Sequence, residues 1–448
     1  MLSIDVRVDD LIKRMTFEEK LLQLSLLILR DNNVNNISRN DEREIPFGIG
    51  SLIYFVDDAE ERNRVQRENI EKTRLGIPIL FGFDVIHGFK NIYPIPLAQS
   101  CSWNPDLSRK LSRIAAYETY NAGINWTFSP MIDVSRDPRW GRVAECYGED
   151  PYTNSIFGVA TVKGYQGNDY NEKYTIASCL KHFVGYGASE GGRDYRYTEI
   201  SSQSLWDTYL LPYKACISAG SSTIMSSFND ISGTPATCNY YTLTEILRNR
   251  WGFTGFVVSD WDAVEQLVYQ GVAKNRADAG KKAFTAGVDM NMKDMIYYDN
   301  FKQLVNDGLL DMSLIDRSVK RILRLKFQLG LFEHPYTKAE KSTELEDEIY
   351  NLCSQMAEES YVLLKNDKVL PISQHVKSIA LIGPMAKDKE NLLGSWSASG
   401  KADYVESLYE GLIAEFGNSI EINYSLGSSF TETSDDMLNE AKRMAEKK

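Results

Sequence analysis

The sequence predicts an α/β protein whose main part is an eight-stranded parallel barrel, a (β/α)8 TIM-like fold. Short apolar runs recur from about residue 48 to 292, and helical stretches such as 105–119 and 243–250 separate many of them. Strands that alternate with helices are typical of a parallel sheet. A doubly wound sheet is the second choice, because no GxGxxG sequence opens a helix. The seven candidate strands are 51–55, 78–83, 125–130, 177–183, 223–227, 255–259 and 287–290.

The eighth strand is expected within the long stretch 186–222. The apolar run at 21–29 is interpreted as an amphipathic or buried helix, since the preceding residues 16–19 have the form of a capping box. The start of the chain therefore looks like folded protein. A signal peptide would need a basic beginning and a small-residue cleavage site.

The barrel domain is expected to span residues 1–335. A helix over 313–329 would close it, with 313–316 capping its start and Gly330 at the position of a C-terminal cap. The polar and charged stretch that follows predicts a linker over 336–354.

A second, smaller α/β domain is predicted over 355–448. Strand patterns begin at 361–366 and 378–384, and a charged amphipathic helix over 437–448 ends the chain. Two or three strands make a thin domain, so we expect an incomplete one. Because unpaired edges and exposed apolar faces are destabilising, 351–448 is predicted to be less stable than the barrel.

Composition narrows the class of partner. The net charge of −12 in 448 residues argues against nucleic acid or an anionic membrane. No apolar run reaches 18 residues, so no membrane span is expected. Six scattered cysteines without a CxxC pair favour reduced thiols and the cytoplasm, with a periplasmic or secreted location as the alternative if a signal peptide was removed. The four histidines lack metal-ligand spacing, so no metal or cofactor is expected. Oligomeric state is not predicted.

The segment 255–261 carries the strongest functional signal. A buried Phe-Val-Val strand stops at Asp260, and Trp261 follows. A polar residue at the end of a barrel strand lies at the rim where chemistry is done. A carboxylate beside an indole suits a sugar, because the carboxylate can attack or stabilise the anomeric carbon and the ring packs on C–H faces. The alternative is a simple N-cap of the following helix.

Three further strands end in polar groups. Asp84 and then His87 follow the strand at 78–83, Arg142 lies beyond the strand at 125–130, and Lys181 ends the strand at 177–183. Each alone has an ordinary reading: a helix cap for Asp84, a surface ion pair for Arg142 and a solvated amine for Lys181. Their shared place at one face of a barrel predicts a common site. Two carboxylates with several cationic or hydrogen-bonding groups suit a neutral polyol better than a phosphate.

Lys181 and His182 are sequence neighbours, and neighbours on a strand point to opposite faces. For both to reach the site, the backbone must be unusual. We expect a non-proline cis peptide or a similar departure from regular geometry within 180–184.

Taken together, these motifs resemble glycoside hydrolase family 3, most closely its bacterial β-glucosidase branch. The motifs are Lys-His-Phe at 181–183 with Gly185, Asp-Pro-Arg-Trp-Gly-Arg at 137–142, Gly-x-Asp-x-x-His-Gly at 82–88 and Ser-Asp-Trp at 259–261. The resemblance runs from about residue 8 to the end. It implies a barrel followed by an α/β sandwich domain, retaining hydrolysis of terminal β-D-glucosyl residues and no cofactor. The implied partner is a β-glucoside or oligosaccharide.

Residue by residue, the resemblance makes Asp260 the nucleophile and Trp261 a subsite wall. Ligands of the sugar hydroxyls would be Asp84, Arg142, Lys181 and His182. Phe228 stands where many members have tyrosine, which puts in doubt a hydrogen bond usual near the nucleophile. The loop 184–195 contains no histidine, which weighs against the N-acetylglucosaminidase branch.

In the β-glucosidase branch the acid/base is a glutamate of the second domain, in a Ser-Gly-Glu-type loop. None of the glutamates after residue 350 has such a context, so this group is expected to be missing from the chain. A β-xylosidase is the nearest alternative, because pocket size around the C6 group cannot be read from sequence. A sugar-binding pseudoenzyme or inactive fragment is the alternative of a different class.

Overall fold

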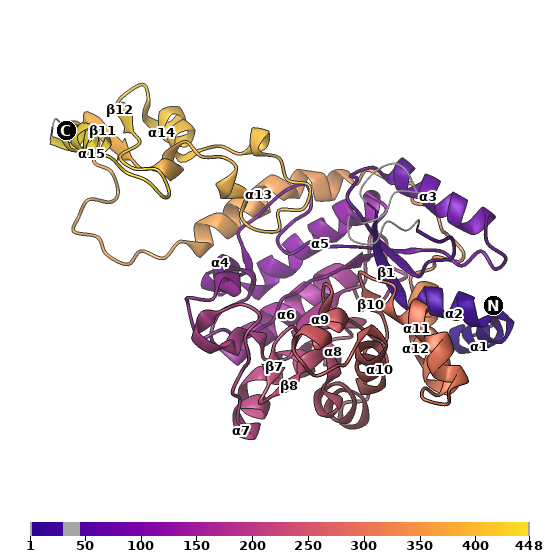
Figure 1. The fold of residues 1–448 in the computed structure, drawn as a ribbon. Helices are drawn as coiled ribbons and strands as arrows, with labels where there is room; N and C mark the ends of the chain where they lie inside the picture. Colours follow the sequence, from indigo (N-terminus) through magenta and orange to yellow (C-terminus); the bar gives the residue numbers. More distant parts are fainter. Residues whose placement is uncertain (1, 30–44, 447–448) are drawn as a thin grey trace. The chain divides into compact units, whose positions relative to one another are not determined.

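The structure is a computed structural model that describes residues 2–29 and 45–446. The chain forms two compact units, Met1–Ser360 and Tyr361–Lys448. Figure 1 shows the chain coloured along the sequence.

Within the described residues, eight parallel strands of the first unit form a ring, which confirms the predicted barrel. One sheet has the order β10-β1-β2-β3-β4 and another the order β5-β6-β9. Parallel bridges from Trp126 to Ala177 and from Val258 to Met290 join the two sheets. The strands are β1 (Ser25–Leu29), β2 (Ser51–Tyr54), β3 (Leu80–Phe83), β4 (Trp126–Thr127), β5 (Cys179–Phe183), β6 (Thr223–Ser226), β9 (Phe256–Val258) and β10 (Asn291–Met292).

The expected position of the eighth strand was wrong. The strand is β1, and the stretch 186–222 instead holds helical turns and helix α8 (Leu211–Ser218). The run at 21–29 splits: α2 (Phe17–Gln23) begins with the predicted capping box at Thr16, and the chain then extends into β1. Every residue of β1 is buried. A strand covered on both faces shows no alternation, so its apolar pattern cannot be told from that of a buried helix.

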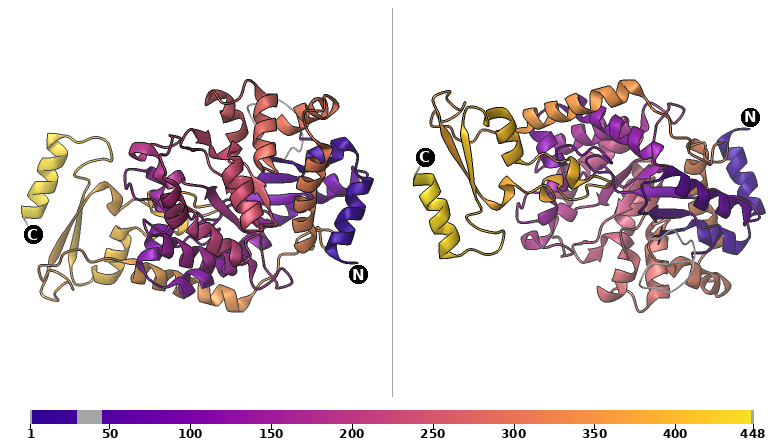
Figure 2. Two further views of the ribbon diagram at one scale, coloured as in Figure 1. Left: turned by 90° about the horizontal axis from the view of Figure 1, so that it is seen from below. Right: turned by 90° about the horizontal axis from the view of Figure 1, so that it is seen from above.

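Helices surround the strands (Figures 1 and 2). Neighbours along the chain pack together: α5 on α6, α6 on α8 and α10 on α11, while α2 contacts both α11 and α12. The predicted helices at 105–119 and 313–329 correspond to α5 and α12; Asp311 caps α12, and Gly330 follows it with positive φ. The bounds of the outer helices are α1 (Ile4–Arg14), α3 (Ala59–Glu71), α4 (Pro96–Cys101), α5 (Pro105–Asn121), α6 (Pro151–Gln166), α9 (Ala263–Tyr269), α10 (Arg276–Ala286), α11 (Ile296–Asn306) and α12 (Met312–Gln328).

Trp126 occupies the middle of the barrel and is fully buried. Its ring meets Phe128 and Phe256 edge-on, with centroids 4.8 and 5.2 Å away. Its indole N–H donates to the Thr223 hydroxyl at 2.8 Å. Gly82 on β3 leaves room for these rings, since a Cβ there would lie 2.7 Å from Phe128. Aromatic packing therefore fills the barrel and fixes the spacing of its strands.

Helix α13 (Thr343–Ser360) belongs to the first unit. It packs on α4 and α5, with Leu352 and Met356 buried. Tyr117 on α5 donates to Glu346 at 2.8 Å. The predicted linker at 336–354 thus includes the first part of this helix, and the compact units divide after Ser360.

The second unit has a two-stranded parallel sheet. β11 (Ser378–Ile382) pairs with β12 (Glu421–Ser425), while α14 (Leu408–Phe416) and α15 (Asp435–Glu446) pack against it. The predicted strand at 361–366 is not formed. A strand needs a hydrogen-bonding neighbour, and within the described residues the sheet of this unit consists of β11 and β12 alone.

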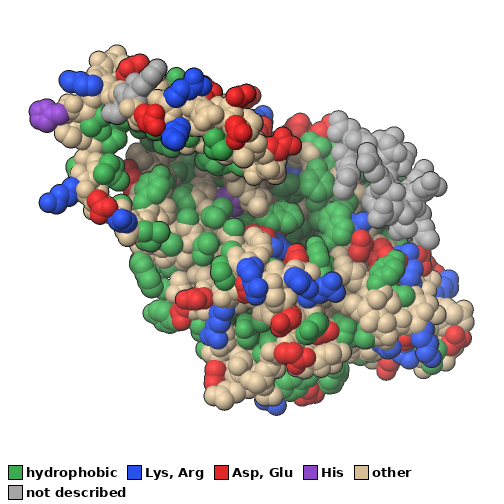
Figure 3. All heavy atoms as spheres, turned by 60° about the vertical axis from the view of Figure 1, so that its left-hand side comes forward, with side chains coloured by type: hydrophobic (Ala, Val, Ile, Leu, Met, Phe, Trp, Pro, Cys, Tyr) green, Lys and Arg blue, Asp and Glu red, His purple; other side chains and the backbone are tan. Residues whose placement is uncertain are grey.

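On the face shown in Figure 3, Lys and Arg side chains are interspersed with Asp and Glu. None of the helices in the described part of the chain has the length and apolar character needed to cross a membrane.

We expect limited proteolysis to cut within 361–377 before it cuts the barrel. Leu364 is 92% exposed and Val369 is 72% exposed, and the segment lacks regular secondary structure. Extended, exposed backbone enters a protease site without unfolding, whereas barrel strands must first open. Mass spectrometry of the fragments over time measures this order. First cuts within the strands β1 to β6 would contradict it.

Candidate active site

The residues predicted for the site come from the carboxyl ends of the barrel strands. Asp84 directly follows β3, Lys181 and His182 belong to β5, and Asp260 lies two residues after β9. Arg142 lies in a short 3₁₀ helix (Gly141–Glu145) beyond β4. Because parallel strands share one direction, these side chains start from the same face of the barrel.

Lys181 and Asp84 form a close ion pair. The Lys181 ammonium lies 2.5 Å from Asp84 Oδ1, and the two side chains are 3% and 24% exposed. A buried amine of this kind is paired, not solvated. The Lys181–His182 peptide bond is cis, which confirms the predicted departure from regular strand geometry. Both side chains reach carboxylates of the site.

Asp260 is buried, with 8% of its surface exposed. Its Oδ1 accepts the Trp261 backbone N–H at 2.7 Å, and its Oδ2 accepts no hydrogen bond from a described residue. The N-cap reading fails, because α9 begins after Asp262 and takes no cap bond from a side chain. Burial raises the pKa of Asp260 to about 6; Arg142, the Trp261 N–H and Lys181 act in the opposite direction. A desolvated carboxylate with one free oxygen is suited to nucleophilic attack.

His182 lies between two carboxylates. Its Nε2 is 3.5 Å from Asp260 Oδ2, and its Nδ1 is 2.9 Å from Asp133 Oδ2. Burial, and then the charges of Arg142 and Lys181, hold the pKa of His182 well below its ordinary value. The imidazole is therefore neutral at pH 7 and serves as a hydrogen-bonding group.

Arg142 is held by Glu145 through two hydrogen bonds of 2.7 and 2.9 Å. Its guanidinium lies 5.6 Å from the Tyr186 ring centroid. Burial acts to lower the pKa of Arg142, but the bonds and charge of Glu145 outweigh burial and raise it. The side chain therefore stays cationic and stabilises the charge of Asp260.

Aromatic side chains adjoin these polar groups. Trp261 and the buried Phe228 pack into one cluster with Tyr186. Phe228 also meets Tyr195 edge-on at 5.0 Å between centroids. The ring of Phe228 cannot donate a hydrogen bond to Asp260 Oδ2, which agrees with the free oxygen found there. Aromatic walls beside polar groups are typical of carbohydrate sites.

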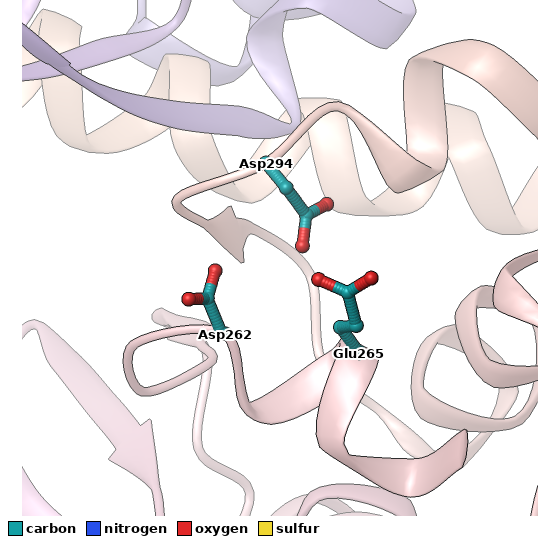
Figure 4. A group of neighbouring side chains, drawn as sticks. All are labelled: Asp262, Glu265 and Asp294. Atoms are coloured by element: carbon teal, nitrogen blue, oxygen red, sulfur yellow. The ribbon is translucent and has the colours of Figure 1, made fainter. Parts of the chain in front are cut away.

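A cluster of three carboxylates near the site has the composition of a metal site. Ligand oxygens of Asp262, Glu265 and Asp294 lie within 4.8 Å of one another. Figure 4 shows the three side chains pointing toward a common space. Arg276 approaches Glu265 at 3.6 Å and Asp294 at 3.9 Å, and Lys293 approaches Asp262 at 3.3 Å. Because these two cations already balance much of the charge, we do not assign a metal here.

Sequence reasoning missed Asp133 and Glu145. Asp133 lies in the segment beyond β4, six residues after that strand ends, and Glu145 lies one helical turn after Arg142. Those positions are the only signals in the sequence. The contacts of both carboxylates become visible only in three dimensions.

Two family models match this chain. Residues 16–325 match the model of the glycosyl hydrolase family 3 N-terminal domain, and residues 361–448 match its C-terminal domain. A periplasmic beta-glucosidase of Salmonella typhimurium is 37% identical over 435 residues, which cover 95% of this chain and 56% of the relative. A beta-xylosidase of Formosa agariphila is 33% identical, covering 91% of this chain and 61% of that protein.

Solved structures show the same fold. A beta-glucosidase from Listeria innocua superposes with a TM-score of 0.90 at 35% identity, covering 98% of this chain and 62% of that one. A mutant beta-glucosidase from the same organism, in complex with laminaribiose, superposes with a TM-score of 0.90 at 34% identity, covering 99% of this chain and 63% of that one. The chain thus spans less than two thirds of the length of these relatives. On the family models, the identities and the fold, the chain belongs to glycosyl hydrolase family 3.

Proposed function

We propose that this chain carries the glycone site and nucleophile of a retaining exo-acting β-glucosidase. The observation that supports it most is the buried Asp260 carboxylate: its free oxygen lies 3.5 Å from His182 Nε2, and the charges of Arg142 and Lys181 stabilise its ionised form. Asp84, Lys181, His182 and Arg142 would bind the hydroxyls of a terminal glucose. Trp261 and Phe228 would pack against its C–H faces.

In the proposed reaction, Asp260 attacks the anomeric carbon and the aglycone oxygen leaves. A covalent glucosyl-enzyme forms, and water then releases glucose. Arg142 and Lys181 keep Asp260 ionised in a desolvated site, where a carboxylate is more reactive than in water.

Protonation of the leaving oxygen needs a second carboxyl group about 5–5.5 Å from the nucleophile. Glu145 is committed to Arg142, and Glu265 faces Arg276. We propose that the acid/base is not among the glutamates of this chain. Loss of general acid catalysis typically costs about 10²–10⁴-fold, so ordinary glucosides should turn over slowly.

The test uses a substrate that needs no acid. We would incubate the protein with a 2-fluoro β-glucoside that bears a dinitrophenolate leaving group, and measure its intact mass. One added fluoroglucosyl group on a peptide containing Asp260, absent from Asp260→Ala, supports the proposal. An adduct on another residue, or equal labelling of the variant, contradicts it.

The matching 2-fluoro xyloside decides between the two enzyme alternatives. The Formosa agariphila relative is named as a beta-xylosidase, so xylose is a real competitor. Faster labelling by the xyloside would favour that activity. Binding of gluconolactone without any adduct would favour a sugar-binding protein instead.

Labelling should depend on pH through Asp260. The ionised carboxylate is the attacking form, and burial raises its pKa to about 6. The rate constant for labelling at low inhibitor concentration should therefore rise with pH, with an apparent pKa of about 6, and level off above roughly pH 7. Because Asp260 interacts with Asp84 and His182, this apparent pKa belongs to the group. A profile that falls over this range would rule out an ionised carboxylate as the attacking group.

We propose a cytoplasmic location for this protein, with the periplasm as the alternative. All six cysteines are free thiols, which agrees with the reducing cytoplasm that the sequence favours. The name of the Salmonella typhimurium relative supports the periplasmic alternative. Fractionation of the source cells would decide between them.

A further inference from the structure

Asp133 is a buried carboxylate that is linked to the proposed site by its contacts with His182. It is 2% exposed and lies beyond β4, where a parallel bridge joins Met131 to Lys181. The Ile132 N–H donates to the Lys181 carbonyl at 2.9 Å, which fixes the register of the two segments. Asp133 is thereby placed beside the backbone of His182.

One oxygen of Asp133 contacts His182 twice. Oδ2 accepts the His182 backbone N–H at 2.8 Å and lies 2.9 Å from ring Nδ1. On the other side, the Tyr213 hydroxyl donates to the His182 carbonyl at 2.7 Å. Main chain and ring are therefore both fixed by buried partners. A backbone N–H can only donate, so Oδ2 acts as an acceptor toward this residue.

The proton on the ring follows from these contacts. If Oδ2 is an acceptor, ring Nδ1 must carry a hydrogen to bond it. His182 is neutral, so Nε2 then keeps its lone pair. That lone pair points to the side where Asp260 Oδ2 lies 3.5 Å away. Two hydrogen-bond acceptors that face each other are stabilised when a donor, such as a sugar hydroxyl, lies within hydrogen-bonding distance of both.

We propose that Asp133 is a positioning residue: it fixes His182 as the neutral Nδ1–H tautomer and directs an unprotonated Nε2 at a glycone hydroxyl beside Asp260. The tautomer stands on the contacts of this chain alone, whereas the hydroxyl rests on the proposed function. His182 is thus an acceptor in the site, while Arg142 and Lys181 are its donors.

The charged groups around Asp133 and His182 determine the pH at which the test is made. Arg142, Lys181, Glu145 and Asp260 surround Asp133 and His182 on the neighbouring elements. Burial raises the pKa of Asp133 to about 7; the His182 N–H, Arg142 and Lys181 oppose that rise, and Glu145 adds to it. Measurement at about pH 8 therefore observes mainly the ionised form of Asp133.

The chain has four histidines, at 87, 182, 334 and 375, so nitrogen NMR of the ¹⁵N-histidine-labelled protein can resolve each ring. The signals missing from His182→Gln identify His182. At about pH 8 we expect the pattern of a neutral ring protonated on Nδ1. A ring protonated on Nε2, or a cationic ring, would overturn the proposal with no need for a variant.

Two substitutions separate positioning from packing. Asp133→Asn keeps an oxygen for both bonds and should retain the tautomer, whereas Asp133→Ala should lose it. Asp133→Ala should also slow fluoroglucoside labelling by about 10- to 100-fold, the scale seen when a carboxylate behind a functional imidazole is removed. Asp133→Asn should stay within a few-fold of the wild type. An unchanged His182 ring and labelling rate in folded Asp133→Ala would overturn the role.

The labelling and NMR measurements together distinguish failure of the proposed function from failure of the positioning role. If the wild type is not labelled but shows the Nδ1–H ring, the proposed function fails and the tautomer assignment stands. If the wild type is labelled but His182 carries its proton on Nε2, the positioning role fails alone. Tyr213→Phe removes the bond to the His182 carbonyl and the 3.5 Å contact with Asp133 Oδ1. It leaves both bonds of Asp133 Oδ2 to His182 in place, so the tautomer should survive that change.

Discussion

Replacing Asp260 with glycine is expected to lower the rate of dinitrophenyl β-glucoside cleavage by about 10⁴-fold or more, the scale on which a lost nucleophile slows a covalent mechanism. The leaving group departs without a proton, so the loss reports on the attack alone. Arg142 and Lys181 would remain, but neither can form a glycosyl ester. Release of dinitrophenolate measures the rate.

Azide provides a gain-of-function control. In Asp260→Gly, azide can enter the space of the lost carboxylate and attack the anomeric carbon from the same side. Dinitrophenolate leaves, and the product is the α-glucosyl azide. Asp84→Asn is the matched variant: it should bind sugar less well, and azide should not rescue it. Rescue of both variants, or full activity of Asp260→Gly, would exclude Asp260 as the nucleophile.

Asp260→Asn tests whether a loss of activity comes from misfolding. The pKa of Asp260 is raised in the folded protein, so its carboxyl stabilises the fold when protonated at low pH. That contribution is lost as pH rises through about 6, because a buried charge must then form. At about pH 7 the neutral amide should therefore unfold at a temperature no lower than that of the wild type.

Trp126→Ala should have the largest effect on stability. The side chain is fully buried between Phe128 and Phe256, and its loss leaves a cavity in the middle of the barrel. Truncation of a buried tryptophan typically costs about 3–5 kcal/mol. Urea unfolding followed by far-ultraviolet circular dichroism measures the shift of the barrel transition.

Two further variants serve as controls for the Trp126→Ala measurement. Trp126→Phe removes the indole N–H without leaving Thr223 unpaired, because its hydroxyl also donates to the Ser178 carbonyl at 2.8 Å. Its cost should be clearly smaller than that of alanine. Trp103 is 74% exposed, so Trp103→Ala should change stability by no more than about 0.5 kcal/mol. Equal effects at positions 103 and 126 would contradict the packing argument.

Six of the eight strands overlap predicted runs, because turn signals and helical stretches frame each apolar run. The run predicted at 287–290 ends directly before β10, and only its last residue, Met290, bridges to Val258. β1 could not be predicted, since it follows α2 directly and is buried on both faces, so its pattern matches that of a helix. The prediction for 361–366 was wrong in the opposite sense, because it placed a strand where none forms. The apolar residues of that segment favour a strand, but a strand also depends on a partner that local sequence does not specify.

The site was predictable where a residue type coincides with a strand end. Asp84, Lys181 and Asp260 meet that condition, and each lies where the pattern indicates. Asp133 and Glu145 act through His182 and Arg142, and such contacts depend on how loops pack. Electrostatic tuning is equally invisible in sequence, since burial causes most of the pKa shift of Asp260.

The position of β1 in the ring has a consequence for synthesis of the chain. β1 pairs with both β2 and β10, so Ser25 lies opposite Asn291. The ribosome releases the first strand long before its last neighbour exists. At about 5–20 residues per second, the intervening chain takes roughly 15 to 50 seconds to make. One edge of β1 stays unsatisfied during that time, and this interval is when the nascent protein is most open to chaperones and to aggregation.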